Sequence, residues 1–140
     1  MRIRLLFLMT AVLVALAGAG VAQQPTFKTL ANVTQLMKAI VIPSSDALFN
    51  VAVETPKDDK EWTALENSAL ALAESGNLLM IGSRAKDSKT WMQYSKAMID
   101  AAEMAFKAAQ SKNVDAVLEA GDKIYATCET CHERYMAKQR

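Results

Sequence analysis

The chain has 140 residues, of which 51% are hydrophobic, 22% are charged and only 6% are aromatic. This length corresponds to one domain with one core. Sixteen basic residues balance 15 acidic ones without a tract of like charge, which argues against a nucleic-acid-binding protein. Two cysteines exclude a disulfide scaffold, and a single histidine excludes most histidine-rich metal sites.

Residues 1–22 are typical of a secretory signal peptide. Two arginines precede an apolar run over Leu5–Leu16, and Gly20 and Ala22 match the small residues that precede a cleavage site. We expect cleavage before Gln23. An uncleaved membrane anchor is the alternative, but the apolar run is shorter than the roughly 20 residues that span a bilayer.

Cleavage would leave residues 23–140 as the mature chain, with a formal net charge of −1 because two arginines are removed. No second apolar run is long enough to span a membrane. We therefore expect an exported protein that does not span the membrane, which in a bacterial cell is periplasmic.

The first predicted helical segment covers 26–53. An apolar face recurs at helical spacing, formed by Leu30, Val33, Met37 and Ile40. Pro43 interrupts the segment, because proline lacks a backbone donor and clashes with the preceding turn. We expect a kink or break near residue 42, beyond the turn that carries Met37, with Ser44, Ser45 or Asp46 capping a second piece.

The second segment begins near Asp58, which has capping-box spacing to Glu61. Its apolar face repeats at spacings of three and four, and consists of Trp62, Leu65, Ala69 and Leu72. The sequence leaves open whether this helix ends at Gly76 or continues to about Ile81.

The third segment follows the polar stretch Gly82–Lys89, and the fourth begins near Asn113. We expect Ser88 to cap the third helix and Asn113 to cap the fourth. The expected inner face of the third helix is Trp91, Tyr94, Met98, Ala101 and Ala105, and that of the fourth is Val117, Gly121, Ile124, Cys128, Cys131 and Tyr135. Four such helices with short links predict an all-α fold, an antiparallel four-helix bundle over 23–140.

The residues that point to chemistry are Cys128-Glu129-Thr130-Cys131-His132, which form the haem c attachment motif C-x-x-C-H. Two cysteines three residues apart lie on one side of a helix, so that both sulfurs can bond the vinyl groups of one haem. The adjacent His132 can then bind the iron. We expect one covalent haem c near one end of the bundle.

Three other interpretations of the motif have less support. A structural zinc site needs about four ligands, and the mature chain contains only three cysteines and histidines in all. A thioredoxin-like C-x-x-C motif lies beside a βαβ unit, for which this sequence has no strands. A plain disulfide between Cys128 and Cys131 is the remaining alternative in an oxidising compartment.

The motif, near the C-terminus of an exported all-helical chain, resembles that of the class II c-type cytochromes, the cytochrome c′ family. The resemblance implies a four-helix bundle, one covalent haem and, in many members, a homodimer. One difference concerns the position four residues after the haem-binding histidine, where many members have a basic residue and this chain has Met136.

The sixth iron ligand decides between two functions. The resemblance places Met37, on the first helix, at the position that faces the iron, and a thioether is a good soft ligand for haem iron. With His132 and Met37 as axial ligands, the protein would carry single electrons between transient redox partners and would not be an enzyme. With an empty sixth site, it would bind nitric oxide or other gases. A haem-free helical protein with a thiol–disulfide pair is the third hypothesis.

Overall fold

A computed structural model describes residues 27–136 of the chain, and the signal peptide and cleavage site predicted for 1–23 lie outside the described residues. The described part is helical and contains no strand, which confirms the prediction of an all-helical fold. Its elements are α2 (Val33–Leu36), the π-helical turn η1 (Met37–Val41), α3 (Ile42–Phe49), the 3₁₀ turn η2 (Asn50–Ala52), α4 (Asp59–Leu79), the 3₁₀ turn η3 (Gly82–Arg84), α5 (Thr90–Gln110) and α6 (Val114–Tyr135).

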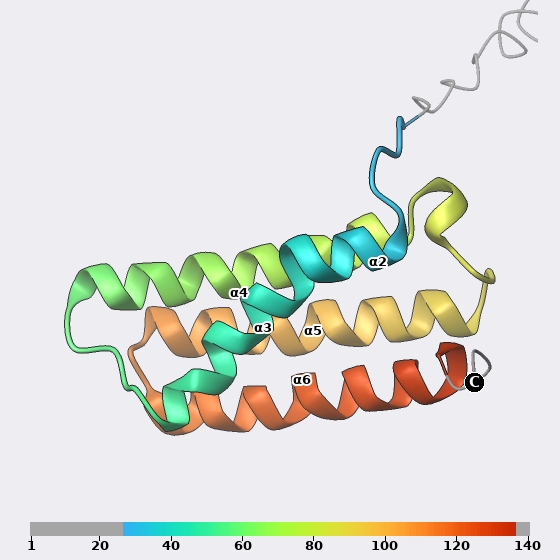
Figure 1. The fold of residues 1–140 in the computed structure, drawn as a ribbon. Helices are drawn as coiled ribbons and strands as arrows, with labels where there is room; N and C mark the ends of the chain where they lie inside the picture. The colour runs from blue at the N-terminus through green and yellow to red at the C-terminus, as the bar shows by residue number, and fades with distance from the viewer. Residues whose placement is uncertain (1–26, 137–140) are drawn as a thin grey trace, which may run out of the picture.

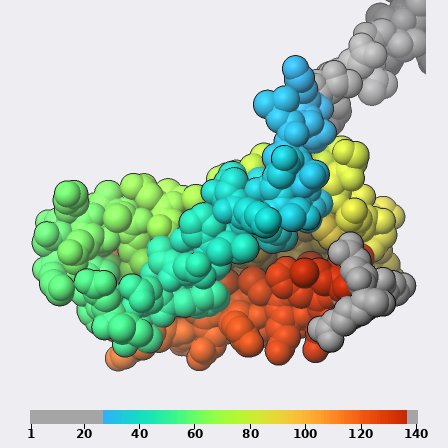
Figure 2. Space-filling model, in the orientation of Figure 1, coloured from blue at the N-terminus to red at the C-terminus, as the bar shows by residue number. Residues whose placement is uncertain are grey.

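The three long helices α4, α5 and α6 lie side by side, with α5 packed on both of its neighbours (Figure 1). The N-terminal segment α2–η1–α3–η2 crosses them diagonally. Its first part, η1, packs on α4. Its later part packs on both α4 and α6 through α3, and on α6 through η2. The segment therefore diverges from α6 toward the end of the molecule at which α6 finishes (Figures 1 and 2). We call this end, formed by the α4–α5 connection and the last turns of α6, the motif end.

The start of α4 is as predicted. Asp58 is the N-cap and its carboxylate accepts a hydrogen bond from the Glu61 backbone N–H at 2.8 Å. The predicted apolar face of this helix is buried throughout, from Trp62 to Leu72.

The end of α4 resolves the question that the sequence left open, because the helix runs through Gly76 to Leu79. Gly76 is at a close crossing with α5, where a Cβ atom would lie 2.5 Å from Ile99 Cγ1 and 2.9 Å from the Ser95 carbonyl oxygen. The glycine thus serves contact between two helices rather than helix termination.

The N-terminal segment differs from the prediction at its start. The helix begins at Val33 instead of residue 26, because Asn32 and Gln35 form a reciprocal capping box. Leu30 precedes the helix and is 83% exposed, so its assignment to the apolar face was wrong.

The segment also differs at Pro43, where we expected a break and a new cap. The helix continues without one, because the preceding residues widen into the π turn and the Ile42 N–H bonds the Met37 carbonyl. Ser44 and Ser45 are buried inside α3, and Ser45 Oγ donates to the Ile42 carbonyl. Met37 was expected to lie before the distortion but is its first residue.

The π turn changes which residues of the segment face the core. The buried apolar residues are Leu36, Val41, Leu48 and Val51, and the spacing of the first two is five residues instead of the three or four of an α-helix. The predicted face at Val33, Met37 and Ile40 is only half-buried. The extra residue in the wide turn explains this shift.

The start of α5 corrects another prediction. Ser88 does not cap the helix. Asp87 Oδ1 accepts hydrogen bonds from the backbone N–H groups of Lys89 and Trp91, at 2.9 and 3.0 Å. Trp91, Met98, Ala101 and Ala105 are buried as predicted, whereas Tyr94 is half-buried.

None of the helices in residues 27–136 is long and apolar enough to cross a bilayer.

Candidate functional site

The motif lies in the last two turns of α6. Asn113 caps this helix, as predicted, through a bond from the Ala116 N–H at 3.1 Å, and the helix continues unbroken to Tyr135. Cys128 and Cys131 are half-buried and His132 is exposed. The structure therefore brings the three residues together on one helix, near its C-terminal end.

We expected both cysteines to lie on the buried stripe of α6, and this was only partly right. The stripe is buried at Val117, Gly121 and Ile124, but becomes half-exposed from Cys128 onward. The cause is the diagonal course of the N-terminal segment, whose α3 and η2 turns cover the first half of α6 only.

The two thiols are free rather than joined in a disulfide. Burial raises the pKa of both thiols, and the neighbouring Cys128 raises the pKa of Cys131 further. Both side chains are therefore neutral at neutral pH. Two partly accessible thiols one helical turn apart on the same side of α6 can both reach one flat ligand.

Aromatic rings support the last turn of α6 on one side. The Tyr135 ring lies edge-on to Trp91, with centroids 5.0 Å apart, and edge-on to Tyr94 at 6.3 Å. The Trp91 ring N–H donates to the Leu79 carbonyl at 2.8 Å, which connects the group to the end of α4. Tyr135, predicted on the inner face of the fourth helix, is thus half-buried and packs against the core.

Asp87 joins this aromatic group through a hydrogen bond that the Tyr135 hydroxyl donates to its Oδ2 atom. That bond, with the backbone N–H bonds to the same carboxylate, lowers the pKa of Asp87 to about 2. Burial, and then the bond to Asp87, raises the pKa of Tyr135. Asp87 is therefore ionised and Tyr135 is protonated over the whole neutral range.

Met37 is half-buried on η1 and packs against the same core as Cys128 and Tyr135. It comes from the segment that crosses both α4 and α6, and at this point the segment packs on α4. The structure thus places Met37 on a different element from the motif, where α6 is left uncovered by α3.

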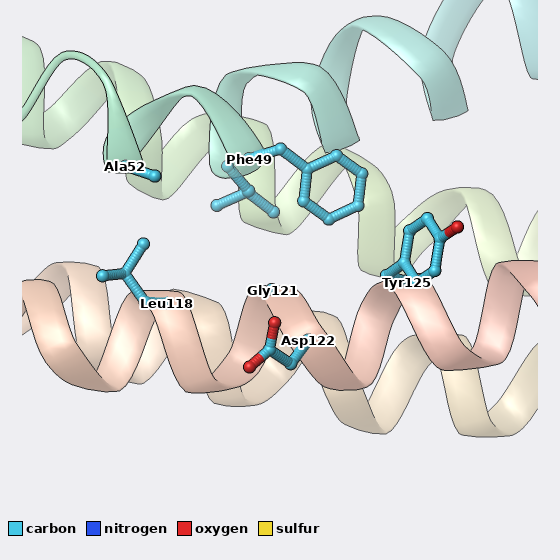
Figure 3. A pocket seen from close by; sticks show the side chains of 7 residues that line it. Phe49, Ala52, Leu118, Gly121, Asp122 and Tyr125 are labelled. Carbon is cyan, nitrogen blue, oxygen red and sulfur yellow. The ribbon is translucent and has the colours of Figure 1, made fainter.

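A groove of about 210 Å³ lies between the N-terminal segment and the first half of α6. Figure 3 shows Phe49 and Tyr125 approaching each other above Gly121, and Leu118 pointing toward Ala52. Leu118, Gly121 and Tyr125 continue at helical spacing into Cys128 and His132. The groove and the motif therefore occupy one face of α6.

Sequence reasoning missed two residues at the motif end. Asp87 had a signal, because aspartate is as good a cap as serine and precedes Trp91 by four residues. Arg84 had none. Its guanidinium is buried and donates to the Ala31 carbonyl at 2.8 Å and to the Leu78 carbonyl at 3.1 Å, which ties the start of α2 to the end of α4.

The residues present fit a covalent haem. The donor set consists of two adjacent thiols and an exposed imidazole on one helix, and a half-buried thioether on another element. Within residues 27–136, no three histidine, cysteine or acidic side chains are grouped to hold a metal ion by themselves. Comparisons with protein-family models, curated proteins and solved structures found no match to the chain.

Proposed function

We propose that the protein is a periplasmic c-type cytochrome with one covalent haem c, which carries single electrons between transient redox partners. The observation that carries this proposal is the C-x-x-C-H motif, formed by two free thiols and the chain's only histidine on consecutive turns of α6. The proposed architecture is an antiparallel four-helix bundle in which the segment from α2 to η2 is the first helix.

Each motif residue has a distinct proposed role. Cys128 and Cys131 hold the haem through thioether bonds, and His132 binds the iron. The haem supplies an iron that alternates between the ferric and ferrous states. The aromatic side chains of Trp91, Tyr94 and Tyr135 pack together beside the motif and support the last turn of α6.

We propose Met37 as the second axial ligand. Its sulfur is a suitable soft donor, and histidine–methionine ligation raises the reduction potential. The observation that supports this choice is that Met37 is half-buried against the same core as Cys128, on the segment that packs across α4 and α6. Core packing alone is the competing explanation for a methionine in this position.

The rest of the proposal concerns the cell and the partners. Export requires the signal peptide at 1–22, and the mature chain at 23–140 would meet its partners through small, short-lived contacts. The protein is not proposed to catalyse a reaction. A homodimer, which the family resemblance implies for many members, is compatible with this role.

Absorption spectra and intact mass of the protein, expressed with the haem-attachment machinery, test the proposal. We expect a chain starting at Gln23 whose mass is increased by one haem, with a low-spin spectrum and an iron–sulfur charge-transfer band. A colourless protein of the bare polypeptide mass would refute it.

The Met37→Ala variant tests the second ligand. We expect conversion from a low-spin to a high-spin spectrum, because the iron loses its thioether donor. Met104→Ala is the matched control, since Met104 is an exposed residue in the second half of α5. A wild-type protein that is already high-spin and shifts readily with carbon monoxide would instead favour the gas-binding function.

A further inference from the structure

We propose that Asp87 and Tyr135 form a clamp that positions the turn carrying His132, and that both are positioning residues for the motif. This inference rests on the proposed function. Its basis is a single carboxylate that bonds the first turn of one helix and the last turn of another. Asp87 Oδ1 accepts from the backbone of Lys89 and Trp91, while Oδ2 accepts from the Tyr135 hydroxyl.

The motif needs such support because of where it lies. Helix ends fray, since their last carbonyls have no partner within the helix. The N-terminal segment covers only the first half of α6, and His132, Glu133, Arg134 and Met136 are all exposed. In the final turn, Tyr135 is the residue that packs against the core.

The contacts of Tyr135 hold this turn against α5. Its ring is held edge-on between Trp91 and Tyr94, and the Arg134 guanidinium lies 5.9 Å from the ring centroid. Its hydroxyl bonds a carboxylate that is 48 residues away in sequence. Because Tyr135 is one helical turn after His132, a movement of Tyr135 would move the imidazole with it.

Asp87 is itself held in place, which a positioning residue requires. Its two backbone bonds set it at the start of α5, and the Trp91 ring beside it is bonded to the end of α4. The position of the last turn of α6 is thereby set by contacts with α4 and α5, and not only by the hydrogen bonds within α6.

The variants Tyr135→Phe and Asp87→Asn test the clamp. The first removes only the hydroxyl, and the second keeps an oxygen that can cap α5 while it removes the charged acceptor. Tyr94→Phe and Asp58→Asn are matched controls, because Tyr94 is in the same aromatic group and Asp58 caps α4 at the opposite end of the molecule.

The first measurement is hydrogen exchange of the backbone amides of 128–136 in the protein as purified. We expect exchange to be on the order of tenfold faster in both clamp variants, which is the effect of losing a hydrogen bond to a charged group. We expect no change in the two controls. The double variant Asp87→Asn/Tyr135→Phe should match Tyr135→Phe alone, because that substitution already removes the hydroxyl that bonds residue 87.

The second measurement is the reduction potential of the haem-loaded variants. Tyr135→Phe alters no charge, so a shifted potential in this variant reports a changed position of the His132 turn. Faster exchange with an unaltered potential would reduce the clamp to a purely structural contact, and unaltered exchange would overturn it. A colourless protein would refute the proposed function, while the exchange data would still decide whether the clamp holds the turn.

Discussion

Gly76 shows how one residue sets the distance between two long helices. A methyl group at this position would meet the Ile99 side chain and the Ser95 backbone of α5, both at less than 3.0 Å. The side chain could rotate away, but the backbone carbonyl could not do so without moving the helix. The contact between α4 and α5, on which Trp91 and therefore the motif end depend, thus requires glycine here.

We expect Gly76→Ala to destabilise the protein by about 1–3 kcal/mol through overpacking, even though alanine is the better helix former. Urea unfolding measures this change. Gly121→Ala is the control: its Cβ would lie 3.7 Å from Phe49 Cδ1, an ordinary contact, so we expect it to be neutral or stabilising by roughly 0.5–1 kcal/mol. Equal losses in the two variants would contradict this explanation.

At the scale of elements, the segment that carries Met37 depends on its first cap. Its α-helical turn α2 has only four residues before the π turn, so few hydrogen bonds hold it. The Asn32–Gln35 capping box supplies two of them, at 2.9 and 3.0 Å. Short helices gain most of their stability from such caps and from packing.

Asn32→Ala should therefore loosen 33–41 selectively. The expected cost is about 1 kcal/mol, which corresponds to roughly fivefold faster amide exchange in that segment. Asn113→Ala removes the equivalent cap of α6 and should cost a similar amount, without a preferential effect on 33–41. Exchange that rises evenly along the chain in Asn32→Ala would show that the cap has no local role.

The comparison of sequence and structure is clearest at this scale. The starts of α4 and α6 followed from strong caps at Asp58 and Asn113, and their buried faces followed in large part from regular apolar spacing. The π turn could not be predicted, because every helical pattern assumes 3.6 residues per turn. The half-exposure of Cys128 could not be predicted either. An apolar stripe shows which side of a helix faces its neighbours, but not where along the helix those neighbours end.

For the whole molecule, ionisable groups define a pH range of stability. Hydrogen bonds and charge from lysine lower the pKa of Asp59 (Lys112) and Glu119 (Lys123), and the Tyr135 hydroxyl lowers that of Asp87. These carboxylates contribute fully to the free energy of unfolding above their ordinary pKa values of 3.8 and 4.5. The contribution is lost as the pH falls through the lowered values. Burial raises the pKa of Cys128 and Cys131 above 9.0 and of Tyr135 above 10.0. The stability that these groups contribute is therefore present at lower pH and is lost as the pH rises through the raised values.

The haem-free chain should thus be most stable between about pH 5 and 8, and lose stability below about 4 and above about 9. Urea unfolding across this range measures the effect. Added salt should reduce part of the stability loss at low pH, because it screens the exposed ion pairs of Asp59 and Glu119. The bond between Asp87 and Tyr135 is not an ion pair and should be less affected. Thioether formation would remove the cysteine contribution at high pH. An acid limb unaffected by salt would rule out the two lysine pairs as its source.

The wide turn at Met37–Val41 separates α2 from α3, and its wider spacing changes the angular position of the side chains between them. Removing one residue there would leave the composition and the caps almost unchanged. It would nevertheless rotate everything before the deletion by about 100° relative to α3, since that is the angle per residue of an α-helix. The orientation of the methionine sulfur and the packing of α3 are therefore set by one count of residues, and neither can be altered by an insertion or deletion without altering the other.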